Sequence, residues 1–291
     1  MRFFLSFLLA VVPSFALAAP ADAGSRPTLR AQHERMKEKL ANNAFGRQLY
    51  LVSEEGSNQL RGDVYGVVNH AFAEVDRGFR EASNWCDVLI LPFNTKHCHA
   101  APGEGATQLT VRIGRKADQP VEQAYPIAFN YRVGARTADY LRIVLQAETG
   151  PLGTRDYQII LEATPLDEAR TFIHLGYSYG FGVVSRLALQ TYLSTVGAGK
   201  VGFTVVGHEA NGAPKYVGGM LGATERNTMR YFIAIDSYLG SLAAAPGTQV
   251  QKRLSDWFAA TEKYPRQLHE MDRGEYMAMK SKETQRLRAA I

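Results

Sequence analysis

Three features of this chain place reactive or polar side chains at spacings that could perform chemistry. Gly176-Tyr177-Ser178-Tyr179-Gly180 has the G-x-S-x-G spacing that holds a nucleophilic serine on a tight turn between glycines. His97-Cys98-His99 would put both imidazoles on one face of a strand, as the first two ligands of a zinc or copper site. Tyrosines recur at alternate positions of several strand-like segments, and a face rich in tyrosine can line a pocket with apolar rings and hydroxyl groups.

The segments around the serine motif argue against a hydrolase site. A nucleophile elbow needs a strand-to-helix turn in a sheet of parallel strands, followed in the chain by an acid and a histidine. Asp236, Asp256, His208 and His269 could supply those groups. However, the preceding strands are joined by turns too short for parallel crossovers, and the alternation of side chains continues beyond Ser178. A serine esterase that uses Ser178 is therefore the alternative function and not the expected one.

The first residues have the pattern of a secretory signal peptide. Arg2 precedes the apolar run 3–12, and Ala16-Leu17-Ala18 has the small side chains that a signal peptidase requires. The apolar run is shorter than the roughly 20 residues that a spanning helix needs. We therefore expect a signal peptide over residues 1–18, cleavage after Ala18, and a secreted protein located in the periplasm.

Export decides how the two cysteines are interpreted. An oxidising compartment favours a bond between Cys86 and Cys98, the only cysteines in the chain. The chain-entropy treatment gives such a short loop about 3 kcal/mol of stabilisation. His97 and His99 then flank a structural disulfide, and no HxxxH or CxxC motif supplies the further ligands of a metal site. We expect a disulfide, no metal and no cofactor.

Five segments between residues 107 and 180 alternate with period two, as strands with one packed and one solvated face do. Short turns rich in Gly and Pro separate them, so the segments form an antiparallel meander. His174 and Arg142 fall on the face opposite the tyrosines and are expected at the surface. The side chains on the packed face are Leu109, Val111, Ile113, Tyr125, Ile127, Phe129, Tyr131, Val133, Leu141, Ile143, Leu145, Ala147, Tyr157, Ile159, Leu161, Ala163, Ile173, Leu175, Tyr177 and Tyr179.

Helices and a strand pair flank this meander. The helix expected over 224–242 is apolar on more than one side, which is typical of a helix packed between other elements. The elements predicted outside the meander are helices over 27–43, 70–91, 183–195, 224–242, 250–262 and 274–290, and strands over 48–52, 60–68 and 200–206.

This order of elements predicts an α+β fold in which a curved antiparallel sheet wraps around a long C-terminal helix. It resembles the helix-grip arrangement of the START-like superfamily of polyketide cyclases and lipid-transfer proteins, over about residues 48–242. The resemblance lies in element order and implies a hydrophobic cavity, but it transfers no catalytic residue. We expect a helix-grip-like domain over 48–243, an N-terminal helical segment over 19–47 and a C-terminal helical extension over 244–291.

The tyrosines turn this fold expectation into a candidate binding site. Ordinary core packing also buries tyrosine, but five hydroxyl groups on one face exceed what a dry core usually carries. We expect an exported binding or carrier protein for an apolar or amphipathic small molecule, with lipids among the candidates. The other interpretation is a non-catalytic envelope interaction protein whose core is filled. The expected ligand-binding residues are Tyr125, Phe129, Tyr131, Tyr157, Tyr177 and Tyr179.

Charge and composition exclude one class of partner. The formal net charge of +5 is modest for 291 residues, and acidic residues are mixed into the basic stretches. No aromatic-plus-basic signature accompanies them, so nucleic acid is not an expected partner. A dispersed positive surface is compatible with peripheral contact with anionic lipid headgroups. With 46% hydrophobic residues, the chain can bury a large core.

Overall fold

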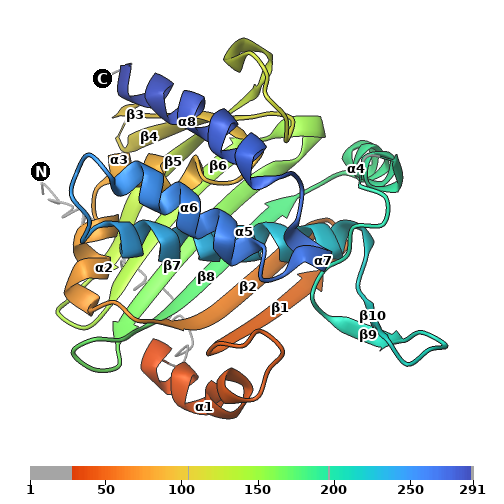
Figure 1. The fold of residues 1–291 in the computed structure, drawn as a ribbon, viewed down its shortest axis with the longest axis horizontal. Coiled ribbons are helices and arrows are strands. Elements are labelled where there is room, and N and C mark those ends of the chain that lie inside the picture. The colour runs from red at the N-terminus through yellow and green to blue at the C-terminus, as the bar shows by residue number, and fades with distance from the viewer. Residues whose placement is uncertain (1–27, 104, 196, 290–291) are drawn as a thin grey trace, which may run out of the picture.

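The fold is built on one curved antiparallel sheet (Figure 1). The computed structural model describes residues 28–103, 105–195 and 197–289, and the predicted signal peptide lies outside these described residues. Eight strands pair in the order β1-β2-β8-β7-β6-β5-β4-β3, so the first hairpin joins the last strand of the meander. The strands are β1 (Leu49–Glu55), β2 (Gln59–Val68), β3 (Thr95–Pro102), β4 (Thr107–Ile113), β5 (Tyr125–Arg136), β6 (Leu141–Thr149), β7 (Arg155–Pro165) and β8 (Thr171–Gly180).

The register of the sheet explains the alternation in the sequence. Ile159 on β7 lies opposite Tyr177 on β8, and Leu161 lies opposite Leu175, so these side chains share one face. Ile143 on β6 lies opposite Leu161 and continues this face across the sheet. All five side chains are buried. The predicted α+β class, with one packed face of an antiparallel meander, is confirmed.

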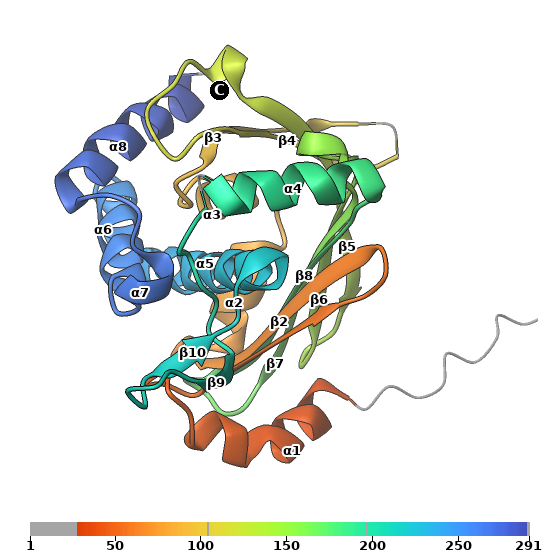
Figure 2. The same ribbon diagram turned by 90° about the vertical axis from the view of Figure 1, so that its right-hand side faces the viewer.

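A long helix, α5 (Gly219–Ser241), lies across the inner face of the sheet (Figure 2). Its close approach to β2 depends on Gly62 and Gly66. A β-carbon on Gly62 would come within 2.3 Å of Thr228 Oγ1, and one on Gly66 within 2.5 Å of the Phe232 ring. Because neither strand position carries a side chain, Thr228 and Phe232 are fully buried. The predicted sheet wrapped around a long C-terminal helix is confirmed, and the helix begins at Gly219 rather than at residue 224.

Three further helices, α6 (Gln249–Thr261), α7 (Pro265–Leu268) and α8 (Arg273–Ala289), lie on the side of α5 that faces away from the sheet (Figure 2). The Trp257 ring lies 4.9 Å from that of Phe93 and 5.2 Å from that of Tyr276, centroid to centroid. Burial of each such aromatic side chain contributes about 1.5–3 kcal/mol. These rings belong to the same hydrophobic core as the inner face of the sheet. The C-terminal helices therefore complete the core rather than extend away from it.

The N-terminal helix α1 (Leu29–Ala41) packs against the outer face of the sheet near one end (Figure 1). Thr28 caps it, because its Oγ1 accepts a hydrogen bond from the backbone N–H of Ala31 at 3.2 Å. Leu29 and Leu40 pack against Phe172 of β8 in a small second cluster with Tyr65 and Val67. The outer face is therefore partly covered and not simply solvated.

The region predicted as one helix over 70–91 is two helices, α2 (Phe72–Phe79) and α3 (Ala82–Leu89), so that prediction is wrong in its continuity. Side chains from elsewhere stabilise the break. Tyr131 donates its hydroxyl hydrogen to the Phe79 carbonyl at 2.9 Å, and Tyr238 donates to the Gly78 carbonyl at 3.3 Å. Carbonyls at a helix end need such partners, and here tertiary contacts from β5 and α5 supply them.

Helix α4 (Val183–Thr195) lies beside α5 on the inner side of the sheet and has the bounds that the sequence predicts (Figure 2). The strand predicted over 200–206 does not join the large sheet. Instead β9 (Val205–His208) pairs with β10 (Pro214–Tyr216) in a separate two-stranded hairpin. Within the described residues, no helix has both the length and the hydropathy needed to cross a membrane.

Candidate functional site

A cavity of about 490 Å³ lies between the inner face of the sheet, α4 and α5. This volume is in the range of roughly 300–1,000 Å³ that is typical of small-molecule sites. Strands β4, β5, β7 and β8 contribute one wall, and α4 contributes Leu189, Tyr192 and Leu193 from the other side. The aromatic side chains of the sheet wall are Phe129, Tyr157, Tyr177 and Tyr179.

The tyrosines of this wall form a continuous aromatic surface. The rings of Tyr157 and Tyr179 stack with centroids 5.3 Å apart, and Tyr177 lies 5.5 Å from Tyr231 of α5. The Tyr157 hydroxyl lies 2.8 Å from Thr154 Oγ1. Burial raises the pKa of Tyr157, Tyr177 and Tyr179, and raises that of Tyr231 to about 12. The wall therefore presents neutral hydroxyls and apolar rings to a ligand.

Two of the six residues predicted to bind ligand do not line the cavity. Tyr125 opens β5 at the rim of the sheet and is 42% exposed. Tyr131 is buried farther along β5, where its hydroxyl donates a hydrogen bond to the Phe79 carbonyl between α2 and α3. Alternation along the strand places all these side chains on one face, but it does not say where along the strand the cavity lies.

The side of the cavity formed by α5 and the segment after β4 carries basic side chains. Ala223, Asn227 and Tyr231 of α5 line it at helical spacing, and Arg226 and Arg230 stand beside them on the same face. Both arginines are buried. Lys116, from the segment between β4 and β5, reaches the same place. The cavity thus joins an apolar aromatic wall to a cluster of cationic side chains.

One carboxylate, that of Glu270, holds this cluster together. Its Oε1 lies 2.5 Å from Arg230 Nη2 and 2.6 Å from Lys116 Nζ, and its Oε2 lies 3.4 Å from Lys200 Nζ. Burial alone would raise the pKa of Glu270, but the charges of Arg230 and Lys116 hold it below its usual value. Burial next to Arg230 lowers the pKa of Lys116 to about 8 and that of Arg226 to about 10. We call Arg226, Arg230, Lys116, Lys200 and Glu270 the Glu270 cluster.

Sequence reasoning did not identify the Glu270 cluster. A signal was present, because Arg226 and Arg230 stand four residues apart in a helix that is apolar on more than one side. Arginine is rarely fully buried unless it has a partner, so a pair inside a buried helix indicates a special environment. Lys116 and Glu270 carry no comparable signal, since they lie in connecting segments far apart in the chain.

Ser178 does not sit on a nucleophile elbow. It lies inside β8, which continues to Gly180 and pairs on both sides with antiparallel strands. The residue opposite Ser178 on β2 is Arg61. The Ser178 side chain points away from the face that carries Tyr177 and Tyr179. Neither the strand-to-helix turn nor the parallel sheet that the motif requires is present around Ser178, so the esterase alternative loses its geometric basis.

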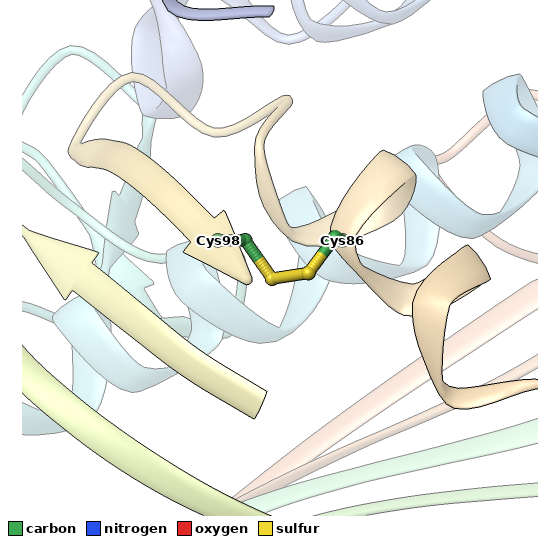
Figure 3. Close-up of a disulfide and its surroundings, with 2 residues drawn as sticks. All are labelled: Cys86 and Cys98. Atoms are coloured by element: carbon green, nitrogen blue, oxygen red, sulfur yellow. A yellow bond between two sulfur atoms is a disulfide. The ribbon is translucent and has the colours of Figure 1, made fainter. Parts of the chain in front are cut away.

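Cys86 and Cys98 form the predicted disulfide, which ties α3 to β3 with their Cα atoms 5.2 Å apart (Figure 3). His97 is partly buried and His99 is exposed on the same strand. Burial, with help from His99 and Arg112, lowers the pKa of His97. Across the described residues, no group of three or more His, Cys, Asp or Glu side chains is arranged to hold a metal ion.

The prediction that His174 is a surface residue is wrong. It does lie on the face opposite the tyrosines, but it is only 5% exposed, because Tyr65 stacks on its ring with centroids 4.4 Å apart. Its Nε2 lies 2.7 Å from Asp63 Oδ1 and its Nδ1 lies 2.7 Å from Glu162 Oε2. Burial by itself would lower the pKa of His174, but these two carboxylates raise it. This network stabilises the packing of β2, β7 and β8 and lies apart from the cavity.

Comparison with protein-family models finds no match, and comparison with curated proteins finds none either. Solved structures with a similar layout include a conserved protein from Geobacillus kaustophilus, a truncated norcoclaurine synthase from Thalictrum flavum and human StAR-related lipid transfer protein 5. They are 12%, 12% and 9% identical, with TM-scores of 0.36, 0.34 and 0.33. They cover 62%, 50% and 57% of this chain and 95%, 91% and 87% of their own chains. Similarity at this level leaves the ligand to be argued from the chain's own residues.

Proposed function

We propose that this protein binds and carries an apolar or amphipathic small molecule, with lipids as the leading class, in the cavity under α4. The observation that supports this most is the cavity itself, which has about 490 Å³ of space between the sheet, α4 and α5, beside a packed core. An open space of this size deprives its walls of packing contacts, so a protein that gains nothing from it would be expected to fill it. The filled-core interaction protein is therefore the weaker interpretation.

The walls of the cavity suit such a ligand. Most lining side chains are apolar or aromatic, and the charged ones come from α5 and from the segment after β4. This distribution is the usual one for sites that bury a largely apolar ligand and orient it with a small number of polar contacts. The sheet and α5 supply rigid walls, so the site is formed before the ligand arrives.

We further propose that the carrier is exported and works in the periplasm next to a membrane. The sequence pattern of residues 1–18 and the disulfide between Cys86 and Cys98 both support an oxidising compartment. Val183, Val184 and Leu187 of α4 are 88%, 83% and 66% exposed, on the helix whose other side chains line the cavity. Flotation with anionic vesicles, compared between the natural protein and Leu187→Asp, tests this contact, which equal flotation of the two would contradict.

A cavity-filling substitution tests the carrier function. Ala223 of α5 lines the cavity, so Ala223→Phe would occupy the open space. We expect the neutral apolar probe N-phenyl-1-naphthylamine to bind the natural protein and to lose about tenfold or more of its affinity in the variant, since the ligand's apolar burial is lost. The measurement is a fluorescence titration. Ala259→Phe, on the exposed side of α6, makes the same change away from the cavity and should leave the affinity unchanged.

The carrier function would be contradicted by two results. One is a natural protein that neither binds the probe nor carries a co-purified small molecule in native mass spectrometry. The other is equal probe binding by Ala223→Phe and the natural protein, which would place the probe outside the cavity.

A further inference from the structure

Arg226 is a buried cation whose hydrogen-bonding capacity is largely unused. A guanidinium carries five N–H donors, and burying them without partners is costly. Nη1 of Arg226 donates to the Val201 carbonyl at 3.1 Å, whereas its Nε is enclosed and has no partner among the described residues. The residue is only 4% exposed and lines the cavity. Its neighbour Arg230 also has an enclosed Nε without a partner in the described part of the chain.

The charges at this end of the cavity do not balance within the protein. Three basic side chains, Lys116, Lys200 and Arg230, contact the single carboxylate of Glu270, and Arg226 lies close enough to feel its charge, so the Glu270 cluster carries excess positive charge. Glu225, next to Arg226 in the chain, does not neutralise this excess positive charge. Its Oε2 accepts from the backbone N–H groups of Phe203 and Thr204, at 2.5 and 3.0 Å. Excess positive charge in a partly enclosed site favours a bound anion.

We propose that the Glu270 cluster is an anion-recognition site, and that the ligand is an amphipathic molecule with a carboxylate or phosphate headgroup. The headgroup contacts Arg226, with Lys116 and Arg230 nearby, and the apolar chain lies along Phe129, Tyr157, Tyr177 and Tyr179. This inference rests on the proposed carrier function and adds the ligand class to it. Planar guanidinium groups bind both carboxylate and phosphate oxygens through paired N–H donors, so the two headgroups share one recognition chemistry.

A set of ligands with one chain and different headgroups tests the proposal. Decanoate, decyl phosphate, decanol and decylamine are titrated into the natural protein by calorimetry. We expect decanoate, decyl phosphate or both to bind about 10- to 100-fold tighter than decanol, the usual gain from hydrogen bonds to a charged group. Decylamine should bind more weakly than decanol, because its charge is repelled by the cluster. The order of decanoate and decyl phosphate identifies which headgroup the site prefers.

Arg226→Met keeps the length of the side chain and removes its charge. We expect this variant to bind decanol as the natural protein does, while its preference for the anions falls to within about threefold. Arg132→Met is the matched control, since Arg132 is an exposed arginine on the outer face of β5. If Arg226→Met does not fold, Lys116→Met in a partly exposed connection replaces it and should lose several-fold of anion affinity while decanol binding is kept.

The outcomes separate this proposal from the carrier function. Equal binding of all the decyl compounds would overturn anion recognition and leave the carrier intact. Binding of none of them, together with failure of the neutral probe, would remove both. Anion preference that survives in both Arg226→Met and Lys116→Met would overturn the assignment of the site to the Glu270 cluster.

Discussion

Two clusters in this molecule each gather basic side chains around one glutamate, and they differ in what they leave unused. In the Glu283 cluster, Lys96 and Lys280 are fully buried and Glu283 is only 1% exposed. Lys96 Nζ lies 3.1 Å from Glu283 Oε1 and 3.0 Å from the Phe93 carbonyl, and Lys280 Nζ lies 2.7 Å from Glu283 Oε2 and from the Thr95 carbonyl. The Glu270 cluster borders the cavity, and its arginines keep donors without partners among the described residues.

The difference teaches how a structural charge cluster can be told from a binding one. Buried charged groups whose hydrogen bonds are met within the chain hold elements together, here α8 against β3 and the segment before it. Buried charges that remain in excess beside an open space are costly unless something else supplies the missing partner. The Glu283 cluster finds its hydrogen-bond partners within the chain, whereas we propose that a bound anion supplies the missing partners of the Glu270 cluster.

The largest expected effect is a loss of stability when the Glu283 cluster is changed. Glu283→Gln leaves Lys96 and Lys280 buried without a counter-charge, so we expect the free energy of unfolding to fall by about 3–5 kcal/mol. Urea denaturation measures this loss. Glu275→Gln, at an exposed position of the same helix, should change stability by less than about 0.5 kcal/mol. A loss as small as that of the control would show that the Glu283 cluster does not hold α8.

A smaller effect is expected from the same change in the other cluster. Glu270→Gln removes the carboxylate of a site that opens on the cavity, where water or an anion can take its place, and we expect a loss of about 1–3 kcal/mol. Decyl phosphate should restore more stability to this variant than to Glu283→Gln in thermal denaturation. If both variants lose the same free energy of unfolding and decyl phosphate stabilises them equally, the two clusters have the same structural role.

The smallest effect is a pH dependence of anion binding. Burial next to Arg230 lowers the pKa of Lys116 to about 8, so its ammonium group is charged below that pH and loses its proton above it. Because only the charged form attracts an anion, decanoate affinity should be steady below about pH 7.5 and fall several-fold as pH rises through about 8. Lys116→Met should abolish this fall. A decanoate affinity that stays unchanged up to about pH 9.5 would exclude Lys116 from the site.

The contribution of the His174, Asp63 and Glu162 network to stability has its own pH dependence. Asp63 and Glu162 have lowered pKa values, so their contribution to stability is present above their unfolded values and is lost as pH falls through the lowered ones. His174 has a raised pKa, so its contribution is complete below about pH 6.5 and is lost as pH rises through the raised value. Together they favour maximal stability in mildly acidic solution.

The sequence predicts the sheet and the tyrosine wall because both depend on local pattern. Alternation determines which face Tyr157, Tyr177 and Tyr179 share, and the expectation of export predicts the pairing of Cys86 with Cys98, as the structure has them. Alternation cannot say where along β5 the cavity ends, so it predicts Tyr125 and Tyr131 among the cavity residues, although they do not line it.

The Glu270 cluster and the burial of His174 depend on contacts between segments that are distant in the sequence. Glu270 meets Lys116 across 154 positions of the chain, and no local pattern predicts that meeting. Alternation describes one strand and so predicts His174 at the surface, whereas its burial comes from Tyr65 and Asp63 on β2 and Glu162 on β7. Charged side chains in particular are placed by their partners, so their roles emerge only from the folded chain.

The most direct test of the central claim is a crystal structure of the protein with decyl phosphate. We predict electron density for the decyl chain along Tyr157, Tyr177 and Tyr179, with the phosphate within hydrogen-bond distance of the Arg226 guanidinium. An empty cavity under saturating ligand would contradict the carrier function. A decyl chain beside Arg226, with the phosphate at the far end or in solvent, would contradict the role assigned to the Glu270 cluster.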